Sequence, residues 1–200
     1  MNWKLIFFIT LISYGGYRHF SQQPVIRGVG ITAGQQPSQN TIQQQPSNQN
    51  GFTHHGYYIT PLQEFAVEAR VLATKGYMFG RESDLSPIDL ALGWGKMSDE
   101  AVLKTIKISQ ANRFYSWRVD QFPIPRKEIE TQSANMHMIP ATPQIEKSLK
   151  SVRPGQVVKL TGYLIEAKAK DGWRWRSSLT RDDTGAGACE LVFVKSLSVS

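Results

Sequence analysis

The chain has 200 residues, 40% of them hydrophobic and 20% charged, with a formal net charge of +7 at pH 7. Its one cysteine, Cys189, excludes an intramolecular disulfide and with it the small disulfide-stapled scaffolds. Lys4, Arg18 and Arg27 are the only charged residues before residue 54, so residues 54–200 hold 20 basic against 16 acidic side chains, a net of +4. That excess is too small to indicate a nucleic-acid partner.

Residues 1–20 have the pattern of a signal peptide or an N-terminal membrane anchor. A short start ending in Lys4 precedes an uncharged, mostly apolar run from Leu5 to Tyr17, which Arg18 closes. The run matches a secretory hydrophobic region and falls short of the ~20 residues of a transmembrane helix. We therefore expect an exported protein, periplasmic or anchored in the inner membrane facing the periplasm, and the pattern leaves cleavage open.

Residues 21–53 predict a disordered linker. They are rich in Gln, Asn and Pro and contain few aliphatic side chains. Such a composition cannot bury enough apolar surface to offset the entropy of ordering the chain. We expect one globular domain over residues 54–200.

The first half of the domain predicts short helices. Thr60-Pro61 resembles a helix start, and residues 62–73 have apolar side chains at helical spacing. Val67, Ala69 and Val71 also alternate with charged residues as in a strand, so both alternatives stay open, and we lean to helix. Further helices are expected over residues 86–92, where Ser86-Pro87 resembles a cap and a first turn, and over residues 98–106.

The remaining segments predict strands around one more helix. Residues 106–119 are rich in aromatic and β-branched side chains, typical of one or two strands, and a helix is expected from Thr142 to Pro154. The last 45 or so residues contain three strand-like runs, 157–168, 173–179 and 189–197, and Asp171-Gly172 indicates a hairpin turn. The sequence predicts an α+β fold in which short helices precede a C-terminal antiparallel meander or small barrel.

Two resemblances add to this interpretation. The stretch from Pro154 to Leu197, a helix end followed by a G-x-x-V-x-L-x-G strand and a hairpin, resembles small barrels of the oligomer-binding (OB) or SH3-like type. The blocks LSPIDLALGWGKMSD, SANMHMIPA and RSSLTRDDTGAGACE resemble uncharacterised exported bacterial proteins, with no named family of known function. The second resemblance implies a location outside the cytoplasm and no particular activity.

The candidate catalytic residues are Cys189 as nucleophile, His137 as base and Asn135 as its orienting group. These residue types form the cysteine-hydrolase constellation, and a carboxylate could replace the thiol. The flanking sequence GACELVFV is typical of a buried strand, which raises the pKa of a thiol, so a packed structural cysteine is the favoured alternative. No metal site or cofactor is predicted.

The candidate ligand-binding residues lie on one strand. Trp173-Arg174-Trp175-Arg176 alternates, so both Trp side chains share one face and both Arg side chains the other, with Lys168 and Arg181 as neighbours. Either the Trp face belongs to the core and the Arg face to solvent, or one face lines a ligand groove. The favoured alternative is the core.

These observations predict a non-enzymatic binding or scaffold protein of the bacterial cell envelope. Its partner would be an envelope protein or polymer. If residues 1–20 are not cleaved off, they would also hold the protein at the membrane. The first alternative is a periplasmic hydrolase that uses His137 with a carboxylate or Cys189. The second is an oligonucleotide- or glycan-binding small barrel, disfavoured for nucleic acid because exported proteins seldom meet it.

Overall fold

The structure is a computed structural model that describes residues 42–180 and 189–200. The predicted signal or anchor at residues 1–20, the linker up to residue 41 and the candidate ligand residue Arg181 lie outside the described residues. Within the described part no helix is long and apolar enough to span a bilayer.

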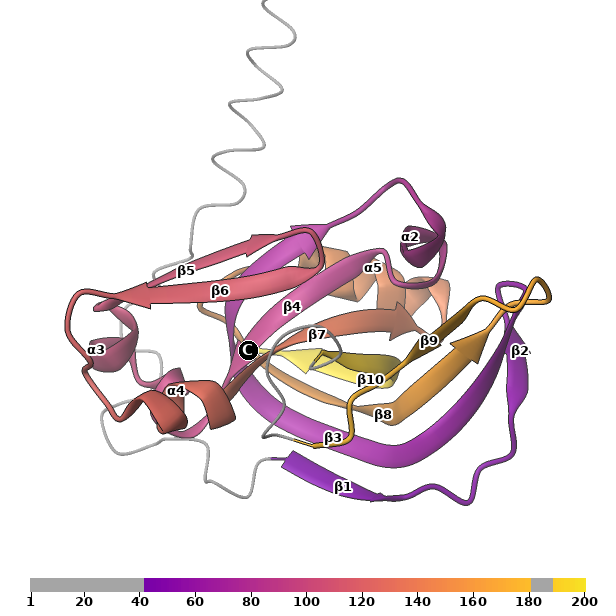
Figure 1. Ribbon diagram of the computed structural model, residues 1–200, viewed down its shortest axis with the longest axis horizontal. Coiled ribbons are helices and arrows are strands. Elements are labelled where there is room, and N and C mark those ends of the chain that lie inside the picture. Colours follow the sequence, from indigo (N-terminus) through magenta and orange to yellow (C-terminus); the bar gives the residue numbers. More distant parts are fainter. Residues whose placement is uncertain (1–41, 181–188) are drawn as a thin grey trace, which may run out of the picture.

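Strands make up most of the described fold (Figure 1). They are β1 (Ile42–Pro46), β2 (Phe52–His54), β3 (Tyr57–Gly76), β4 (Ile88–Gly93), β5 (Ile106–Ala111), β6 (Phe114–Val119), β7 (Ser133–Pro140), β8 (Val157–Lys168), β9 (Arg174–Arg176) and β10 (Glu190–Val199). The helices are short: α2 (Arg81–Leu85), the 3-10 turn η1 (Gly95–Ser98), α3 (Glu100–Leu103), α4 (Arg126–Thr131) and α5 (Pro143–Ser151).

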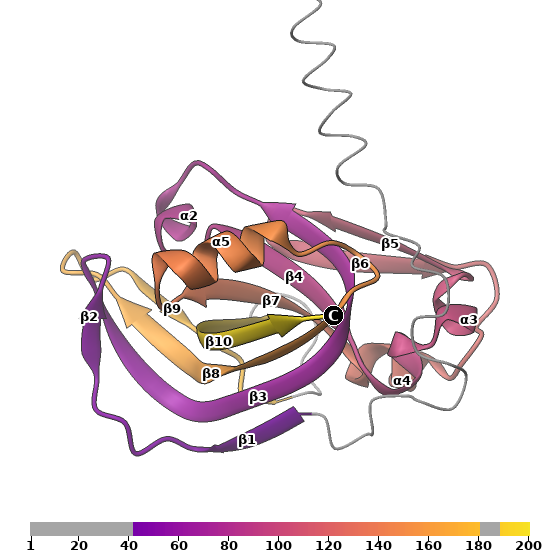
Figure 2. The same cartoon turned by 180° about the vertical axis from the view of Figure 1, so that it is seen from behind.

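Five strands of the main sheet pair in a closed circuit. β3 pairs with β4, β4 with β7, β10 with β8 and β8 with β3, all antiparallel, whereas β7 and β10 are parallel. β1 and β2 extend the sheet from β3, and β9 extends it from β8. The sheet is therefore mixed. The three predicted C-terminal strands do pair antiparallel, but β8 lies between β9 and β10, so they form no meander, and β10 is also parallel to β7. β5 and β6 form a separate hairpin beside β4 (Figures 1 and 2).

The main error of the sequence prediction concerns residues 62–73, which form the middle of β3 and not a helix. Phe65, Val67, Ala69 and Val71 are buried, so the alternating pattern decides over the helical one. Pro61 fits this strand because the pairing of β3 with β8 shifts register there, and a bulge tolerates the missing N–H group.

The predicted helix over residues 86–92 is also wrong, because these residues enter β4. Every residue from Ile88 to Gly93 is buried, and a strand covered on both faces loses the polar alternation that would identify it. Ser86, read as a helix start, instead follows the end of α2. The predicted 98–106 helix is reduced to η1 and the single turn of α3.

Several later elements are confirmed, although the strand predicted over residues 173–179 is reduced to β9, and α4 and β7 were not predicted. β8 has the predicted bounds, β5 and β6 occupy residues 106–119, and α5 lies inside the helix predicted after Thr142. Asp171-Gly172 lies in the turn between β8 and β9, where Gly172 has a φ of 91°. β1 lies before residue 54 and β2 ends at it, so the described sheet begins earlier than the predicted domain boundary.

Two apolar clusters lie on opposite faces of the circuit. On β7 and β10, Met138 and Val192 point to one cluster while Ile139 and Leu191 point to the other. The first cluster is surrounded by the five paired strands and is covered by α5. The second lies on the outer face, beneath β2 and β9. The outer face of β4 and β7 also holds buried polar side chains, which form the first candidate site.

Candidate functional site

A buried polar cluster lies on the outer face of β4 and β7. Asp89 and His137 are paired across the two strands, and Asn135 lies two residues from His137 on the same face. The exposed fractions of Asp89, His137 and Asn135 are 0%, 3% and 4%. The predicted neighbours His137 and Asn135 thus do share a face, and the carboxylate beside them is Asp89.

Arg113 completes this cluster from the tip of the β5–β6 hairpin. Asn112 and Arg113 have φ values of 51° and 67°, as in the two-residue turns that match the twist of a hairpin. Nη1 of Arg113 donates to Asp89 Oδ1 at 2.8 Å, and its Nη2 donates to Ser83 Oγ at 3.1 Å. The guanidinium also lies 3.7 Å from the ring centroid of Tyr77. These contacts hold the hairpin against the sheet.

His137 is enclosed on two sides. Its Nδ1 lies 3.0 Å from Asp89 Oδ1 without the alignment of a hydrogen bond, and its ring centroid lies 4.8 Å from that of Trp175. Asp89 already accepts from Arg113, and Asn135 Nδ2 donates to the backbone carbonyl of Arg113 at 2.9 Å. The geometry is that of a structural polar network in which Asp89, Arg113 and Asn135 bond one another, while His137 Nδ1 faces Asp89 without a hydrogen bond.

Cys189 lies at the border of the same cluster. Its Sγ contacts the backbone carbonyl of Arg113 at 3.8 Å. Burial, followed by the negative charges of Glu190 and Asp89, raises the pKa of the Cys189 thiol to about 11. Since the thiolate is the nucleophile, a raised pKa works against catalysis by this residue at neutral pH.

We expect alkylation of Cys189 by iodoacetamide at pH 8 to be roughly 100-fold slower than that of a free thiol, because a pKa near 11 leaves that much less thiolate. The rate should climb with pH up to about pH 11 and then level off. Mass spectrometry of the alkylated chain, with the protein unfolded in urea as the reference, measures it. A folded-state rate equal to the urea rate would contradict the buried environment.

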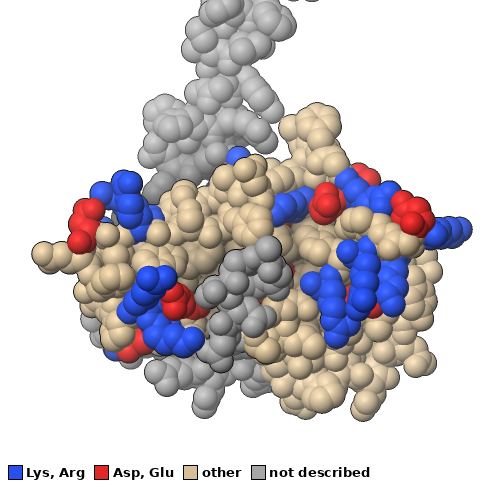
Figure 3. Space-filling model, in the orientation of Figure 1, with Lys and Arg blue, Asp and Glu red and all other residues tan. Residues whose placement is uncertain are grey.

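A second candidate site lies on the exposed face of β3, β8 and β9. Tyr58, Lys168 and Arg174 are aligned across the three strands, and the next row pairs Glu166 with Arg176. Figure 3 shows basic side chains gathered over the region of β8 and β9. Tyr58 is 52% exposed, which leaves an aromatic ring available beside the cations.

Glu166 is the centre of this cationic face, which we define as Tyr58, Lys168, Arg174 and Arg176. Lys168 Nζ lies 3.0 Å from Glu166 Oε2, Arg176 Nη1 lies 3.3 Å from Oε1, and Arg174 bonds the same Oε1. Burial raises the pKa of the Glu166 carboxyl, but the bonds from the three cations outweigh burial and hold the pKa below its ordinary value. One carboxylate thus orients three cations, and two positive charges remain in excess.

The Trp face of β9 points the other way. Trp173 and Trp175 are half-buried and pack against the outer apolar cluster, and Trp175 also contacts His137. The structure therefore separates the predicted Trp–Arg set into a packed aromatic face and an exposed cationic one. Sequence reasoning missed Tyr58 and Glu166, because their cross-strand register with Lys168 and Arg176 depends on the long pairing of β3 with β8.

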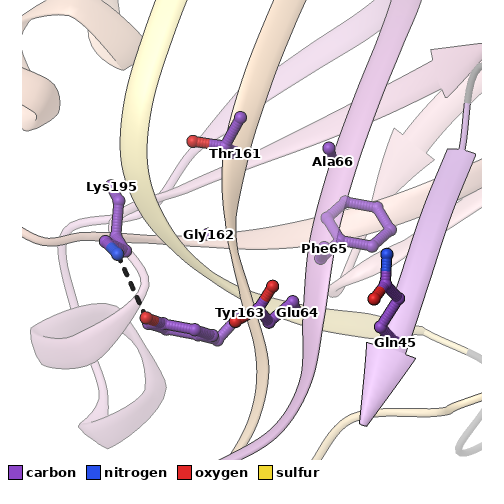
Figure 4. Close-up of a pocket in the computed structure, with 8 residues that line it drawn as sticks. All are labelled: Gln45, Glu64, Phe65, Ala66, Thr161, Gly162, Tyr163 and Lys195. Atoms are coloured by element: carbon purple, nitrogen blue, oxygen red, sulfur yellow. Dashed lines mark hydrogen bonds between the residues drawn. The ribbon is translucent and has the colours of Figure 1, made fainter. Parts of the chain in front are cut away.

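A shallow groove on the face of β8 opposite the cationic face is a third candidate site (Figure 4). Its volume is about 230 Å³, and it runs from β1 across β3 and β8 to β10. Lys195 Nζ donates to the hydroxyl of Tyr163 at 3.0 Å, and Glu64 lies beside Tyr163 on the paired strand β3. Because Lys195 covers the Tyr163 ring, this groove offers less free aromatic surface than the cationic face.

Comparisons with protein-family models, with curated proteins and with solved structures found no match for this chain. In the described ranges, 42–180 and 189–200, no group of three His, Cys, Asp or Glu side chains is placed to hold a metal ion.

Proposed function

We propose that this chain is a non-enzymatic binding protein of the bacterial cell envelope, and that it binds an anionic envelope polymer on the cationic face. The observation that carries the proposal is the in-register row of Tyr58, Lys168 and Arg174, joined by Arg176. Exposed cations next to an aromatic ring suit a polymer that alternates negative groups with flat or apolar rings.

The bonds to Glu166 support a binding role over a merely solvated surface. The side chains of Lys168, Arg174 and Arg176 are 51%, 55% and 45% exposed, yet each is directed by the same buried carboxylate. Cations held in this way lose less conformational freedom when a ligand arrives.

The strand order supports an OB-type barrel as the scaffold. In this chain the circuit β3-β4-β7-β10-β8 carries one parallel pair, β7 and β10, and α5 connects β7 to β8. OB folds are five-stranded, partly open barrels whose strand faces and loops bind oligonucleotides and oligosaccharides. Of these two ligand classes we propose the oligosaccharides, because residues 1–20 predict export and exported proteins seldom meet nucleic acid.

The hydrolase alternative has less support. It needs a reactive His137 or Cys189, but His137 is 3% exposed and burial raises the pKa of Cys189 to about 11. A substrate would also have to displace Trp175, whose ring contacts the imidazole. These properties favour binding over hydrolysis.

Replacing Arg174 and Arg176 together with Gln should weaken binding to an anionic polysaccharide about tenfold or more, equivalent to about 1.4 kcal/mol. Tyr58→Ala should weaken it several-fold, and the salt dependence should become shallower only in the arginine variant, since it alone loses charge contacts. Titration calorimetry with heparin at several salt concentrations measures both effects.

The matched control is Arg126→Gln, which removes an exposed arginine paired with Glu130 away from the cationic face. If this control weakens heparin binding as much as the double variant does, heparin responds to the net charge of the protein, and the proposed binding site is wrong. If single-stranded DNA binds the parent far more tightly than any anionic polysaccharide does, the ligand class is wrong.

A further inference from the structure

The segment between β3 and α2 presents two large apolar side chains to solvent. Met78 is 73% exposed and Phe79 is 87% exposed, the highest values among the large hydrophobic residues of the described chain. Gly76 and Gly80 flank them. Figures 1 and 2 both show this segment standing out from the body of the fold, so we refer to residues 77–80 as the apolar tip.

The base of the apolar tip is firmly held. The backbone N–H of Tyr77 donates to the backbone carbonyl of Pro87 at 2.9 Å. The Tyr77 hydroxyl accepts from the backbone N–H of Arg113 at 3.0 Å. Ser83 Oγ donates to the carbonyl of Phe79 at 2.6 Å. These bonds fix both ends of the tip and keep its apolar side chains directed outward. Exposing apolar side chains to water is unfavourable, so the tip is held in a conformation that suits an apolar contact.

A third exposed apolar side chain lies next to this anchor. Phe114 follows Arg113 at the tip of the β5–β6 hairpin and is 49% exposed. Because Arg113 bonds Tyr77, the hairpin tip and the apolar tip lie at the same end of the fold. That end therefore carries Met78, Phe79 and Phe114 around one polar anchor.

We propose that the apolar tip inserts into the headgroup region of a lipid bilayer. Three side chains of this size bury roughly 150–250 Å² each, which together falls short of the ~800 Å² per partner of a stable protein interface. A bilayer requires no matching shape, and it accepts a convex apolar tip at the boundary between headgroups and acyl chains.

The charge near the tip fits an anionic membrane. Arg81 pairs with Asp171, which connects α2 to the turn between β8 and β9. The end of β3, α2 and the strands around the β8–β9 turn hold six basic side chains (Lys75, Arg81, Lys168, Lys170, Arg174, Arg176) against four acidic ones (Glu82, Asp84, Glu166, Asp171), and Arg113 at the hairpin tip is balanced by Asp89. The excess of positive charge is attracted by anionic headgroups.

The proposed envelope location brings a bilayer within reach. If residues 1–20 act as an anchor, only about 20 residues of sequence separate that anchor from β1. Such a short tether raises the effective concentration of the tip at the membrane, so a weak contact suffices. To this extent the inference rests on the proposed location.

Met78 itself supplies the experiment, because the other methionines of the described chain, Met97, Met136 and Met138, are fully buried. The full chain is treated with chloramine-T, a charged oxidant that stays in water, and methionine sulfoxide is followed by peptide mass spectrometry. On vesicles of phosphatidylcholine and phosphatidylglycerol, Met78 should oxidise at least fivefold more slowly than in solution. Vesicles of phosphatidylcholine alone should protect it less.

Two variants make the result specific. Phe79→Ser should return the Met78 oxidation rate on vesicles to within about twofold of the solution rate, whereas Phe122→Ser, at a 54% exposed residue elsewhere, should leave the protection intact. The buried methionines report in the same digest that each variant is folded.

Equal Met78 oxidation with and without vesicles overturns the proposal, whether or not the chain sediments with them. Sedimentation of the chain with vesicles tests whether residues 1–20 anchor it, and Met78 oxidation tests whether the tip inserts. The two measurements therefore distinguish failure of the proposed location from failure of the proposed insertion. Protection that needs no lipid and grows with protein concentration also overturns it, because a second copy would then cover the tip.

Discussion

Replacing Arg113 with methionine should lower the free energy of unfolding by about 3 to 5 kcal/mol. Asp89 is fully buried, and Arg113 is the cation that compensates its charge at 2.8 Å. Without the guanidinium, the carboxylate stays in a poorly solvated place beside His137 Nδ1, at 3.0 Å without hydrogen-bond alignment, and Asn135 Nδ2 at 3.4 Å, both weaker partners than a bonded arginine. The hairpin tip also loses its attachment to Ser83.

Chemical denaturation followed by tryptophan fluorescence measures this loss. The control Arg126→Met breaks a pair whose arginine side chain is 70% exposed, and it should cost no more than about 0.5 kcal/mol. The double variant Arg113→Met with Asp89→Leu should recover part of the loss, since removal of both charges leaves none unpaired. A loss below about 1 kcal/mol in Arg113→Met would mean that the cluster does not hold the hairpin.

Gly162→Ala should destabilise the fold by about 3 kcal/mol or more. A Cβ atom at this position would lie 1.8 Å from the backbone oxygen of Phe193, and backbone cannot rotate away as a side chain can. β10 shifts its register against β8 between Val194 and Ser196, next to this contact. The methyl group would therefore force apart two strands of the closed circuit.

The control for this substitution is Gly76→Ala at the end of β3. A Cβ atom there meets nothing within 4 Å, so the variant should match the parent or gain up to about 1 kcal/mol through a less flexible unfolded chain. Thermal unfolding of the two variants side by side makes the comparison. Equal melting temperatures for both would contradict the close approach of β8 and β10.

The elements that could be predicted from the sequence are those whose local pattern matches their surroundings. β8 and α5 have clear strand and helix patterns with unambiguous ends, and their bounds were predicted closely. β4 could not be predicted because both of its faces are buried, one by the apolar core and one by the cluster around Asp89. In β3 a proline and a chance helical spacing obscured the alternation, and only the pairing with β8 decides between them.

The candidate sites show the same limit. The alternation in Trp173-Arg174-Trp175-Arg176 predicted two opposite faces, and the structure places the Trp pair against the outer apolar cluster. The role of Glu166 could not be predicted, because its three cationic partners are distributed over β8 and β9. Asp89, Arg113 and His137 come from separate elements, and no spacing in the sequence connects them.

The circuit of strands has a consequence for the order in which the chain folds. β3 pairs along its length with β8, with Arg70 opposite Val157, and the parallel partner of β7 is β10, the last strand. Contacts between residues so distant in sequence form slowly, because the entropy of closing large loops is lost before any pairing is gained. While the chain is being synthesised, β3 can pair with β4 early, but it lacks β8, and β7 lacks its parallel partner until β10 has emerged. The export proposed for this chain would gain from such a delay, since a chain that crosses a membrane unfolded must not fold before it crosses.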